Sequence, residues 1–150
     1  MEIIPLWLFP RRKTQPRCAI LVGDGKFKLY IASDANQRNE LERLFGNSLN
    51  DAERRCPALL IPQPAHARGP DTVAVRIEDT TIGYLHPTGA RVFLAALAVA
   101  GNERAACAAT IEARWDPALG EHAYFRVRLD AVMPFKFLDP QVEMTVLKRA

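Results

Sequence analysis

The sequence of 150 residues is poor in the residues that build disulfide frameworks and zinc ribbons. Its three cysteines, Cys18, Cys56 and Cys107, are odd in number and far apart, and no two of them form a CxxC pair. This pattern argues against both kinds of framework and favours reduced, buried thiols. We therefore expect a cytoplasmic protein.

Groups that carry catalysis are equally scarce. The three histidines, His66, His86 and His122, are scattered along the chain, and no pair has the spacing of metal ligands. No serine lies in a GxSxG turn, and no glycine-rich loop leads into a helix through a lysine followed by serine or threonine. We predict no enzyme activity, no metal and no cofactor.

Long apolar runs are also missing. The apolar part of the longest expected helix, Val92 to Ala100, falls far short of the roughly 20 residues that span a bilayer. The run from Ile3 to Phe9 contains Pro5, and basic residues follow it at positions 11–13, the reverse of the order in a secretory signal. We expect no membrane association. The run from Ile3 to Phe9 is instead a candidate arm for self-association or for binding a protein partner.

What the chain does contain is typical of one folded domain. Its composition is 49% hydrophobic and 25% charged, and 150 residues suffice to bury a core. There is no internal repeat and no low-complexity tract. The net charge is +3, and arginine, whose planar fork suits phosphate, supplies most of the 20 basic residues. A charge of this size permits nucleic-acid binding but does not require it.

The clearest pattern lies in residues 72–100. Alternation from Val73 to Ile77, a short polar reversal and a second run from Thr81 to Leu85 predict a β-hairpin. Gly83 inside the second run marks a bulge or a close approach by another backbone. A helix from Thr88 to Ala100 follows, with Pro87 in its first turn and a cap at Gly101. Two sets of residues at helical spacing indicate that this alanine-rich helix is buried: Val92, Ala95, Ala96 and Val99, and Phe93, Leu97 and Ala100.

The residues before this segment predict three further elements and a loop. The run from Cys18 to Val22, a turn at 23–25 and alternation from Lys26 to Ile31 are typical of a hairpin. Ser33 and Asp34 suit the cap of a helix that runs to about Arg43. A loop and short helix over 46–55 would precede a strand at 57–61 and a proline-rich loop at 62–70.

The residues after it predict strands. Alternation places Cys107, Ala109, Ile111, Ala113 and Trp115 on one face of a strand over 105–115, and a turn follows at 116–120. The strand over 121–130 should bury Ala123, Phe125, Val127 and Leu129 and turn His122, Tyr124, Arg126 and Arg128 outward. Residues 141–147 would close the fold as a last strand.

The central segment also resembles a known family. VAVRIEDTTIGYL, followed by a helix with Ala90 near its start, is similar to the signature of the HIRAN domain. That module is attached to fork-remodelling helicases and occurs as a small stand-alone bacterial protein. The prolines from Pro62 to Pro70 match its loop before the hairpin, and Trp115-Asp116 and Phe125 to Leu129 resemble its closing strands. The family pattern, unlike the helix propensity of residues 40–45, places a strand just before Gly46, and we favour the helix.

Together these patterns predict a single α+β domain over residues 1–150. It should be mainly antiparallel, a small and partly open barrel resembling the OB and SH3-like folds, with one buried helix and an N-terminal hairpin. Its parts would be an arm and hairpin over 1–44, a HIRAN-like core over 45–131 and a C-terminal strand over 132–150.

Basic and aromatic residues on the expected outer faces favour binding over catalysis. Arginine can hold phosphate while a neighbouring ring stacks on a base. The plainer interpretation is a solvated face whose charge Glu78, Glu112 and Asp130 offset, with Tyr84 as a packing residue. The outward residues are Arg76, Arg114, Arg126 and Arg128, with Tyr84 and Tyr124 nearby.

The resemblance adds a specific expectation. HIRAN modules hold the 3′ end of single-stranded DNA in a pocket formed by the loop before the hairpin and the residues around GYL, which implies a role for Tyr84. The Tyr-Asp pair usual in that loop is replaced here by Arg68-Gly69, although Arg68 and His66 are suited to phosphate. We expect a non-enzymatic module that binds single-stranded DNA or DNA ends, as in DNA repair. The alternative is a protein-interaction or assembly domain that has lost the DNA pocket. The candidate site residues are His66, Arg68, Arg76, Tyr84, Arg126 and Arg128.

Overall fold

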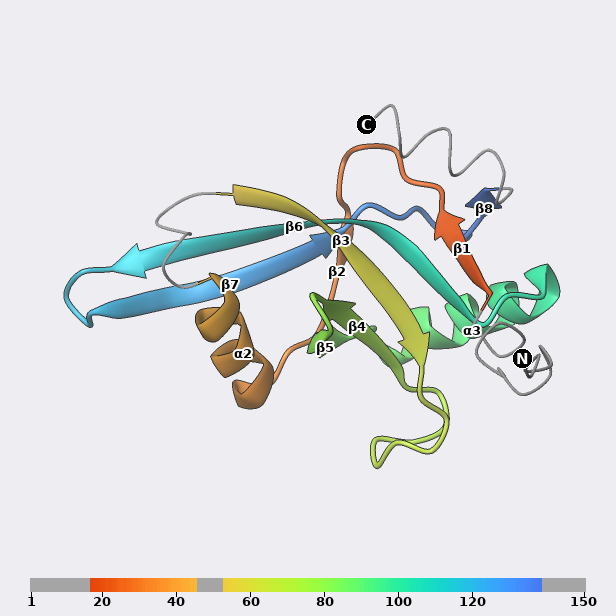
Figure 1. Ribbon diagram of the computed structural model, residues 1–150, viewed down its shortest axis with the longest axis horizontal. Coiled ribbons are helices and arrows are strands. Elements are labelled where there is room, and N and C mark those ends of the chain that lie inside the picture. Colours follow the sequence, from red (N-terminus) through yellow and green to blue (C-terminus); the bar gives the residue numbers. More distant parts are fainter. Residues whose placement is uncertain (1–16, 46–52, 139–150) are drawn as a thin grey trace, which may run out of the picture.

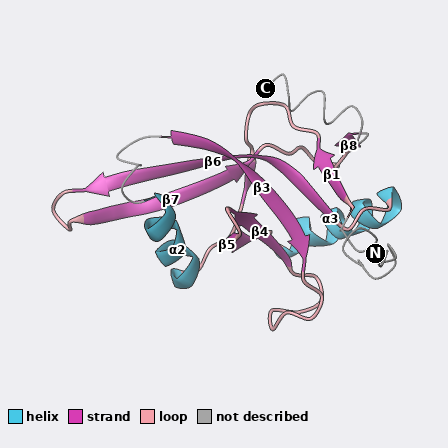
Figure 2. Cartoon of the chain, in the orientation of Figure 1, coloured by secondary structure: helices cyan, strands magenta, loops and turns pink. Residues whose placement is uncertain are grey.

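The computed structural model describes residues 17–45 and 53–138. In this part of the chain an eight-stranded, mainly antiparallel sheet curls into a half-barrel with two helices, as the sequence predicted (Figures 1 and 2). The strands are β1 (Cys18–Leu21), β2 (Leu29–Tyr30), β3 (Glu53–Pro62), β4 (Val73–Ile77), β5 (Thr80–Tyr84), β6 (Arg104–Asp116), β7 (Glu121–Leu129) and β8 (Phe137–Leu138), and the helices are α2 (Ala35–Phe45) and α3 (Pro87–Ala100).

The sheet follows the order β2-β7-β6-β3-β4-β5, so β7 and β5 lie near its two edges. The segment after β2 joins these edges. Tyr30 pairs with Arg128 of β7, and two residues later Ala32 exchanges two backbone hydrogen bonds of 2.8 Å with Tyr84 of β5. Beyond this bridge the edges stay apart, and α2 packs against both β5 and β7. We call the gap between β7 and β5 that α2 occupies the seam.

The core fills the inner face of the curled sheet. Alternate residues of β4, β6 and β7 enter it, together with one face of each helix, as expected for strands with one buried side. The largest fully buried side chains are Leu41, Phe45, Leu60, Val73, Val75, Ile77, Ile82, Phe93, Ile111, His122 and Leu129. One continuous core therefore joins the sheet to both helices.

The central hairpin forms as predicted. Glu78 and Asp79, with φ of 51° and 62°, make its two-residue turn. The register shifts within the hairpin, so Ile82 is an extra residue on β5. Gly83 also lies against another backbone: a Cβ there would be 2.7 Å from the carbonyl oxygen of Ala32. Both features suggested by this glycine are present.

Helix α3 begins with Pro87 in its first turn and ends at Gly101, as predicted. Gly101 has φ of 71°, and its N–H donates to the carbonyl of Ala98. Asn102 donates to the carbonyl of Leu97, which completes a Schellman motif. The expectation of burial is right for one face only. Ala90, Phe93 and Leu97 are buried, whereas Ala100 and the stripe that contains Val92 and Val99 are exposed, because no strand or helix of the described residues covers them.

Helix α2 confirms the cap at its start. The carboxylate of Asp34 accepts hydrogen bonds from the N–H groups of Asn36 and Gln37. The Gln37 side chain accepts in return from the N–H of Asp34, which makes a capping box. The helix continues to Phe45, because Leu41 and Phe45 are both buried on its inner face. The family pattern's prediction of a strand just before Gly46 is therefore wrong.

The predicted N-terminal hairpin is wrong. Strand β1 pairs with β6 in parallel and with β8, and β2 pairs with β7. The turn residues between β1 and β2 are held by distant partners. Gly25 donates its N–H to the carboxylate of Asp130, and Phe27 is buried beside Arg55, whose guanidinium lies 5.0 Å from its ring centre. These contacts hold the segment between β1 and β2 against other parts of the sheet, and the two strands do not pair with each other.

Two other expectations need correction or fall outside the described residues. Residues 53–55 belong to β3 and are not part of a loop or helix, because they pair with 110–112 of β6. The rest of that loop, the arm at residues 3–9 and the last strand at 141–147 lie outside the described residues. The segment before that strand contributes only β8, which pairs with β1.

The alternation predicted for β7 is wrong at its start. Tyr124 pairs with Arg114 and His122 with Trp115, so Ala123 is an extra residue that forms a bulge. The bulge reverses the faces before it: His122 is buried and Ala123 is exposed. His122 was expected to point outward. It instead contacts α2, where its Nδ1 lies 2.8 Å from Glu42 Oε2.

Among the described residues, no helix is long and apolar enough to cross a membrane.

The contacts of Gly83 give a first prediction. A valine there should cost about 2 kcal/mol in unfolding free energy, since a Cβ would lie 2.6 Å from the Ile31 side chain and 2.7 Å from backbone. Gly89 is the matched control, because a Cβ there meets nothing within 4 Å. Gly89→Ala should stabilise by up to about 1 kcal/mol, as usual for glycine in a helix. Urea unfolding of both variants measures this. Equal stability of Gly83→Val and wild type would contradict the close approach.

Leu97 gives a second prediction. It is 3% exposed, so Leu97→Ala should cost roughly 2–5 kcal/mol by removing core contacts and leaving a cavity. Val99 lies on the same helix but is 91% exposed, and Val99→Ala should change stability by less than about 0.5 kcal/mol. Thermal or urea unfolding compares the two. Similar losses in both variants would show that the buried face has been misassigned.

Candidate nucleic-acid interface

The six candidate residues form two groups with Arg76 between them. His66, Arg68 and Tyr84 meet where the loop over residues 63–72 folds onto β5. Arg126 and Arg128 lie on β7, on either side of the buried Val127. We describe the first group, named here the loop cluster, and then the second.

The loop cluster is built by ring stacking. The Arg68 guanidinium lies 4.2 Å from the centre of the Tyr84 ring, within the range of a cation–π contact. The His66 ring packs against the same tyrosine, with 5.3 Å between ring centres and a tilt of 55°. Two residues of the loop thus cover one residue of the strand.

Hydrogen bonds fix the cluster further. His66 Nδ1 accepts from the backbone N–H of Arg68 at 3.1 Å, so in the neutral ring the proton is on Nε2. Nε2 lies 3.3 Å from the Tyr84 hydroxyl and donates to its oxygen. The hydroxyl hydrogen of Tyr84 is then left to donate to another acceptor. The cluster therefore offers one hydroxyl donor beside the N–H donors of a guanidinium.

The loop that carries the cluster is internally bonded. Its ends are joined by a bond of 2.8 Å from Gln63 N–H to the Thr72 carbonyl. Within it, Gly69 donates to the carbonyl of His66, and the Thr72 hydroxyl donates to the carbonyl of Gly69 at 2.7 Å. Gly69 has φ of 122°, a conformation that favours glycine. These bonds hold Arg68 in place before any ligand arrives.

Exposure assigns the roles within the cluster. Tyr84 is only 8% exposed, which supports the packing interpretation of this residue, because little of its ring is left for a base. Arg68 is exposed and has no carboxylate partner among the residues the structure describes. The surface open to a ligand is therefore the guanidinium of Arg68, with Tyr84 as its support.

Arg76 is engaged locally. Its guanidinium donates to the carbonyl of Asp79 at 2.8 Å, across the hairpin turn. It lies two residues from Ala74, the strand partner of Tyr84, and between the buried Val75 and Ile77. Arg76 therefore points away from the core, as predicted, and stabilises the turn.

The arginines of β7 differ from each other. Arg128 is half-buried and lies 3.2 Å from Glu112 and 3.8 Å from Glu53. Arg126 is exposed, 3.9 Å from the same Glu112, and its guanidinium lies 4.9 Å from the Tyr124 ring centre. Carboxylates therefore neutralise Arg128, as the plainer interpretation expected, whereas Arg126 retains much of its capacity to bind an anion.

The two groups are too far apart to form one small site. Arg76 of β4 and Ala106 of β6 both pair with Leu59 of β3, so they lie at the same height along the sheet. Arg126 pairs with Glu112 of the same strand. At roughly 3.3 Å per residue, these positions are about 20 Å apart along β6. Between them, the Arg55 guanidinium lies over the ring of the buried Phe27.

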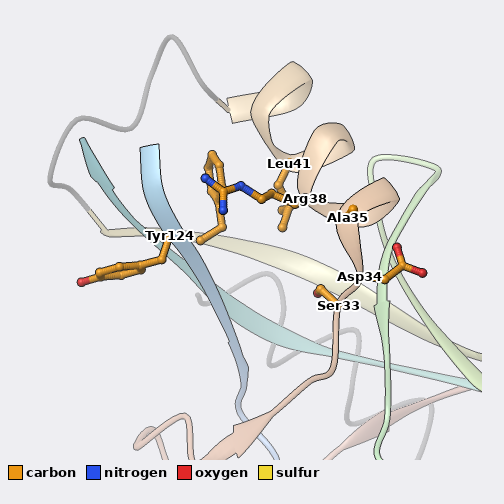
Figure 3. A pocket seen from close by; sticks show the side chains of 7 residues that line it. Ser33, Asp34, Ala35, Arg38, Leu41 and Tyr124 are labelled. Atoms are coloured by element: carbon orange, nitrogen blue, oxygen red, sulfur yellow. The ribbon is translucent and has the colours of Figure 1, made fainter. Parts of the chain in front are cut away.

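A cleft at the seam holds residues that the sequence did not single out. Its lining comes from the start of α2 and from β7, and its volume is about 390 Å³ (Figure 3). The residue of note is Arg38, which donates to the backbone carbonyl of His122. No local motif marks it, because the contact joins residues that are far apart in the chain. The lining residues are Ser33, Asp34, Ala35, Arg38, Leu41, Tyr124 and Phe125.

The described residues contain no group of three histidine, cysteine or acidic residues that could hold a metal. The cysteines differ in their surroundings. Burial raises the pKa of the Cys107 thiol to about 12, and the nearby Asp130 carboxylate adds to this. Burial also raises the pKa of Cys56. Cys18 is exposed, so the expectation of buried thiols is wrong for it.

Comparisons with protein-family models, curated proteins and solved structures found no match.

The cysteines yield a third prediction. Thiolate is the reactive form, and exposure controls access to it. At pH 8 a thiol reagent should modify Cys18 first, Cys56 more slowly and Cys107 only after unfolding. Mass spectrometry of peptides after timed labelling measures the three rates. Labelling of Cys107 in the native protein as fast as that of Cys18 would contradict its burial.

Proposed function

We propose that the protein is a non-enzymatic module that binds single-stranded nucleic acid, with DNA as the expected form, through the loop cluster. The observation that supports this most is the Arg68 guanidinium at 4.2 Å from the Tyr84 ring. Single strands are bound by planar groups that stack on bases next to cations that hold phosphate. Arg68 combines both properties in one side chain.

The support of Arg68 matters as much as its charge. A free arginine loses rotamer freedom when it binds, which weakens the complex. Arg68 is already held on Tyr84 and within a bonded loop, so less freedom remains to be lost. A base would stack on its outer face, so that Tyr84, guanidinium and base form a column. The Tyr84 hydroxyl would donate to a neighbouring phosphate or carbonyl oxygen.

The resemblance to HIRAN domains agrees with the position of this cluster. In that family the loop before the hairpin and the residues around GYL form the DNA pocket. The usual Tyr-Asp pair is replaced here by Arg68-Gly69, so end recognition through those side chains is not part of the proposal. A column on Arg68 would bind internal nucleotides as readily as ends.

Arg126 is proposed as a secondary phosphate contact. It is exposed and lies on Tyr124, but its carboxylate neighbour and its distance from the loop cluster make it the weaker candidate. Arg76 and Arg128 are assigned to the stability of the fold, because the first holds a turn and the second is paired with carboxylates.

The fourth prediction tests the two roles of Arg68 separately. Arg68→Gln should weaken binding and flatten the slope of log affinity against log salt by about 0.7, the value for one lost phosphate contact to a single strand. Arg68→Lys keeps the charge but not the plane, so it should retain the slope and lose about 1–3 kcal/mol of stacking. Fluorescence anisotropy with a short labelled oligonucleotide at several salt concentrations measures both.

The control is Arg91→Gln, which removes an exposed arginine from α3, an element outside the cluster. It should leave the affinity and the slope close to wild type. Equal effects of Arg68→Gln and Arg91→Gln would show nonspecific attraction by net charge. No binding at low salt, together with a stable oligomer in light scattering that is lost on deleting residues 1–10, would favour the assembly function.

A further inference from the structure

One edge of β7 has no neighbouring strand at residues 123–127 among the described residues. On the side away from β6, β2 pairs only with Arg128 and Leu129. After Tyr30 the chain turns to β5, so no described strand continues beside residues 123–127. An unpaired edge presents backbone N–H and C=O groups that can pair with an added strand. The missing strand would be a direct continuation of β2.

The cleft lies along this edge. Its volume of about 390 Å³ is within the range of ligand sites, and α2 forms its other wall (Figure 3). Leu41 and Phe125 give it an apolar surface that belongs to the core. Helix α2 packs against β7 beside this edge and so obstructs the approach of a second sheet. This geometry favours a peptide over edge-to-edge pairing with another copy of the chain.

Arg38 already supplies a substitute partner for the edge. It reaches from α2 toward β7, and its guanidinium donates to the carbonyl of His122 (Figure 3). The carboxylates of Asp34 and Glu42, four residues before and after Arg38, bind other groups. Asp34 caps the helix, and Glu42 binds the His122 ring. Arg38 has no carboxylate partner in the described part of the chain, and its remaining N–H groups are available to carbonyl oxygens in the cleft.

We propose that the seam cleft binds a short extended peptide segment of a partner protein by adding it to the edge of β7. Backbone hydrogen bonds to β7 would supply much of the affinity, as in other cases of strand addition. One apolar side chain of the peptide would contact the half-buried Phe125, and Arg38 would donate to a peptide carbonyl. The free edge from Ala123 to Val127 comprises five residues, so it accommodates an added strand of about five residues.

This site is separate from the loop cluster and does not depend on nucleic-acid binding. The charges around it are mixed, with Asp34 at its rim and Arg38 within it. The peptide is therefore expected to be recognised by its extended backbone and apolar side chain, and not by a high charge of either sign.

The test is a titration of the full-length, ¹⁵N-labelled protein. The probe is a capped five-residue peptide of alternating threonine and valine with a central leucine, and NMR follows the amide signals of β7 and α2. A second peptide has the same side chains but N-methyl groups on alternate residues, which remove main-chain donors. Loss of two such bonds should weaken binding about tenfold.

Two protein variants make the test specific for the cleft. Ala35 lines the cleft and is exposed, so Ala35→Trp should fill it and abolish the saturable shifts. Asn36 is exposed and lies outside the lining, so Asn36→Trp is the matched control and should bind like wild type. Circular dichroism confirms that both variants are folded.

The proposal is supported if the unmodified peptide shifts β7 and α2 signals saturably, the methylated peptide binds about tenfold more weakly and Ala35→Trp alone loses binding. Equal affinity for the two peptides would overturn strand addition. Absence of saturable shifts at millimolar peptide, or shifts that Ala35→Trp leaves unchanged, would overturn the site. Oligonucleotide binding, measured separately, does not enter these outcomes.

Discussion

The close approach of the segment after β2 to Gly83 is the constraint on which both proposed sites depend. Only a residue without a side chain lets Ala32 exchange two hydrogen bonds with Tyr84, because a Cβ would meet the Ala32 carbonyl at 2.7 Å. This bridge fixes Tyr84 beneath the loop that carries His66 and Arg68. It also directs the chain away from β7 into α2, so no described strand lies beside residues 123–127 of β7. One backbone contact thus positions a binding cluster on one side and a cleft on the other.

The two surfaces use different chemistry because their environments differ. Arg68 is exposed, rests on an aromatic ring and has no acidic partner among the described residues, so it suits an anionic, stacking ligand. Arg38 also has no carboxylate partner in this part of the chain, but it already donates to a backbone carbonyl, so it suits a neutral peptide backbone. Arg128, between Glu53 and Glu112, suits neither and contributes to the fold. Residue type alone does not separate these three roles.

Local chemistry made much of the fold predictable. The cap at Asp34, the turn at Glu78 and Asp79, and the Gly101 cap each depend on neighbouring residues, and each forms as predicted. The pairings of β1 and β2 depend on distant residues and were missed. The run at 18–21 has the composition of a hairpin strand, yet it pairs with residues 104–106. One extra residue, Ala123, reversed the face of His122, and such an insertion leaves no mark in an alternating pattern. In the loop cluster, His66 and Arg68 were proposed from residue type and Tyr84 from the family resemblance, whereas the seam cleft required the arrangement of α2 beside β7.

The parallel pairing of β1 with β6 has a consequence for how the chain reaches its native state during synthesis. The strand partners that the structure describes for residues 18–21, namely residues 104–106 and 137–138, leave the ribosome long after them. The β4–β5 hairpin and α3 can form earlier from local contacts alone. Non-local pairings close slowly because a long loop must be ordered first. The N-terminal strand, although made first, is therefore among the last elements to find its place.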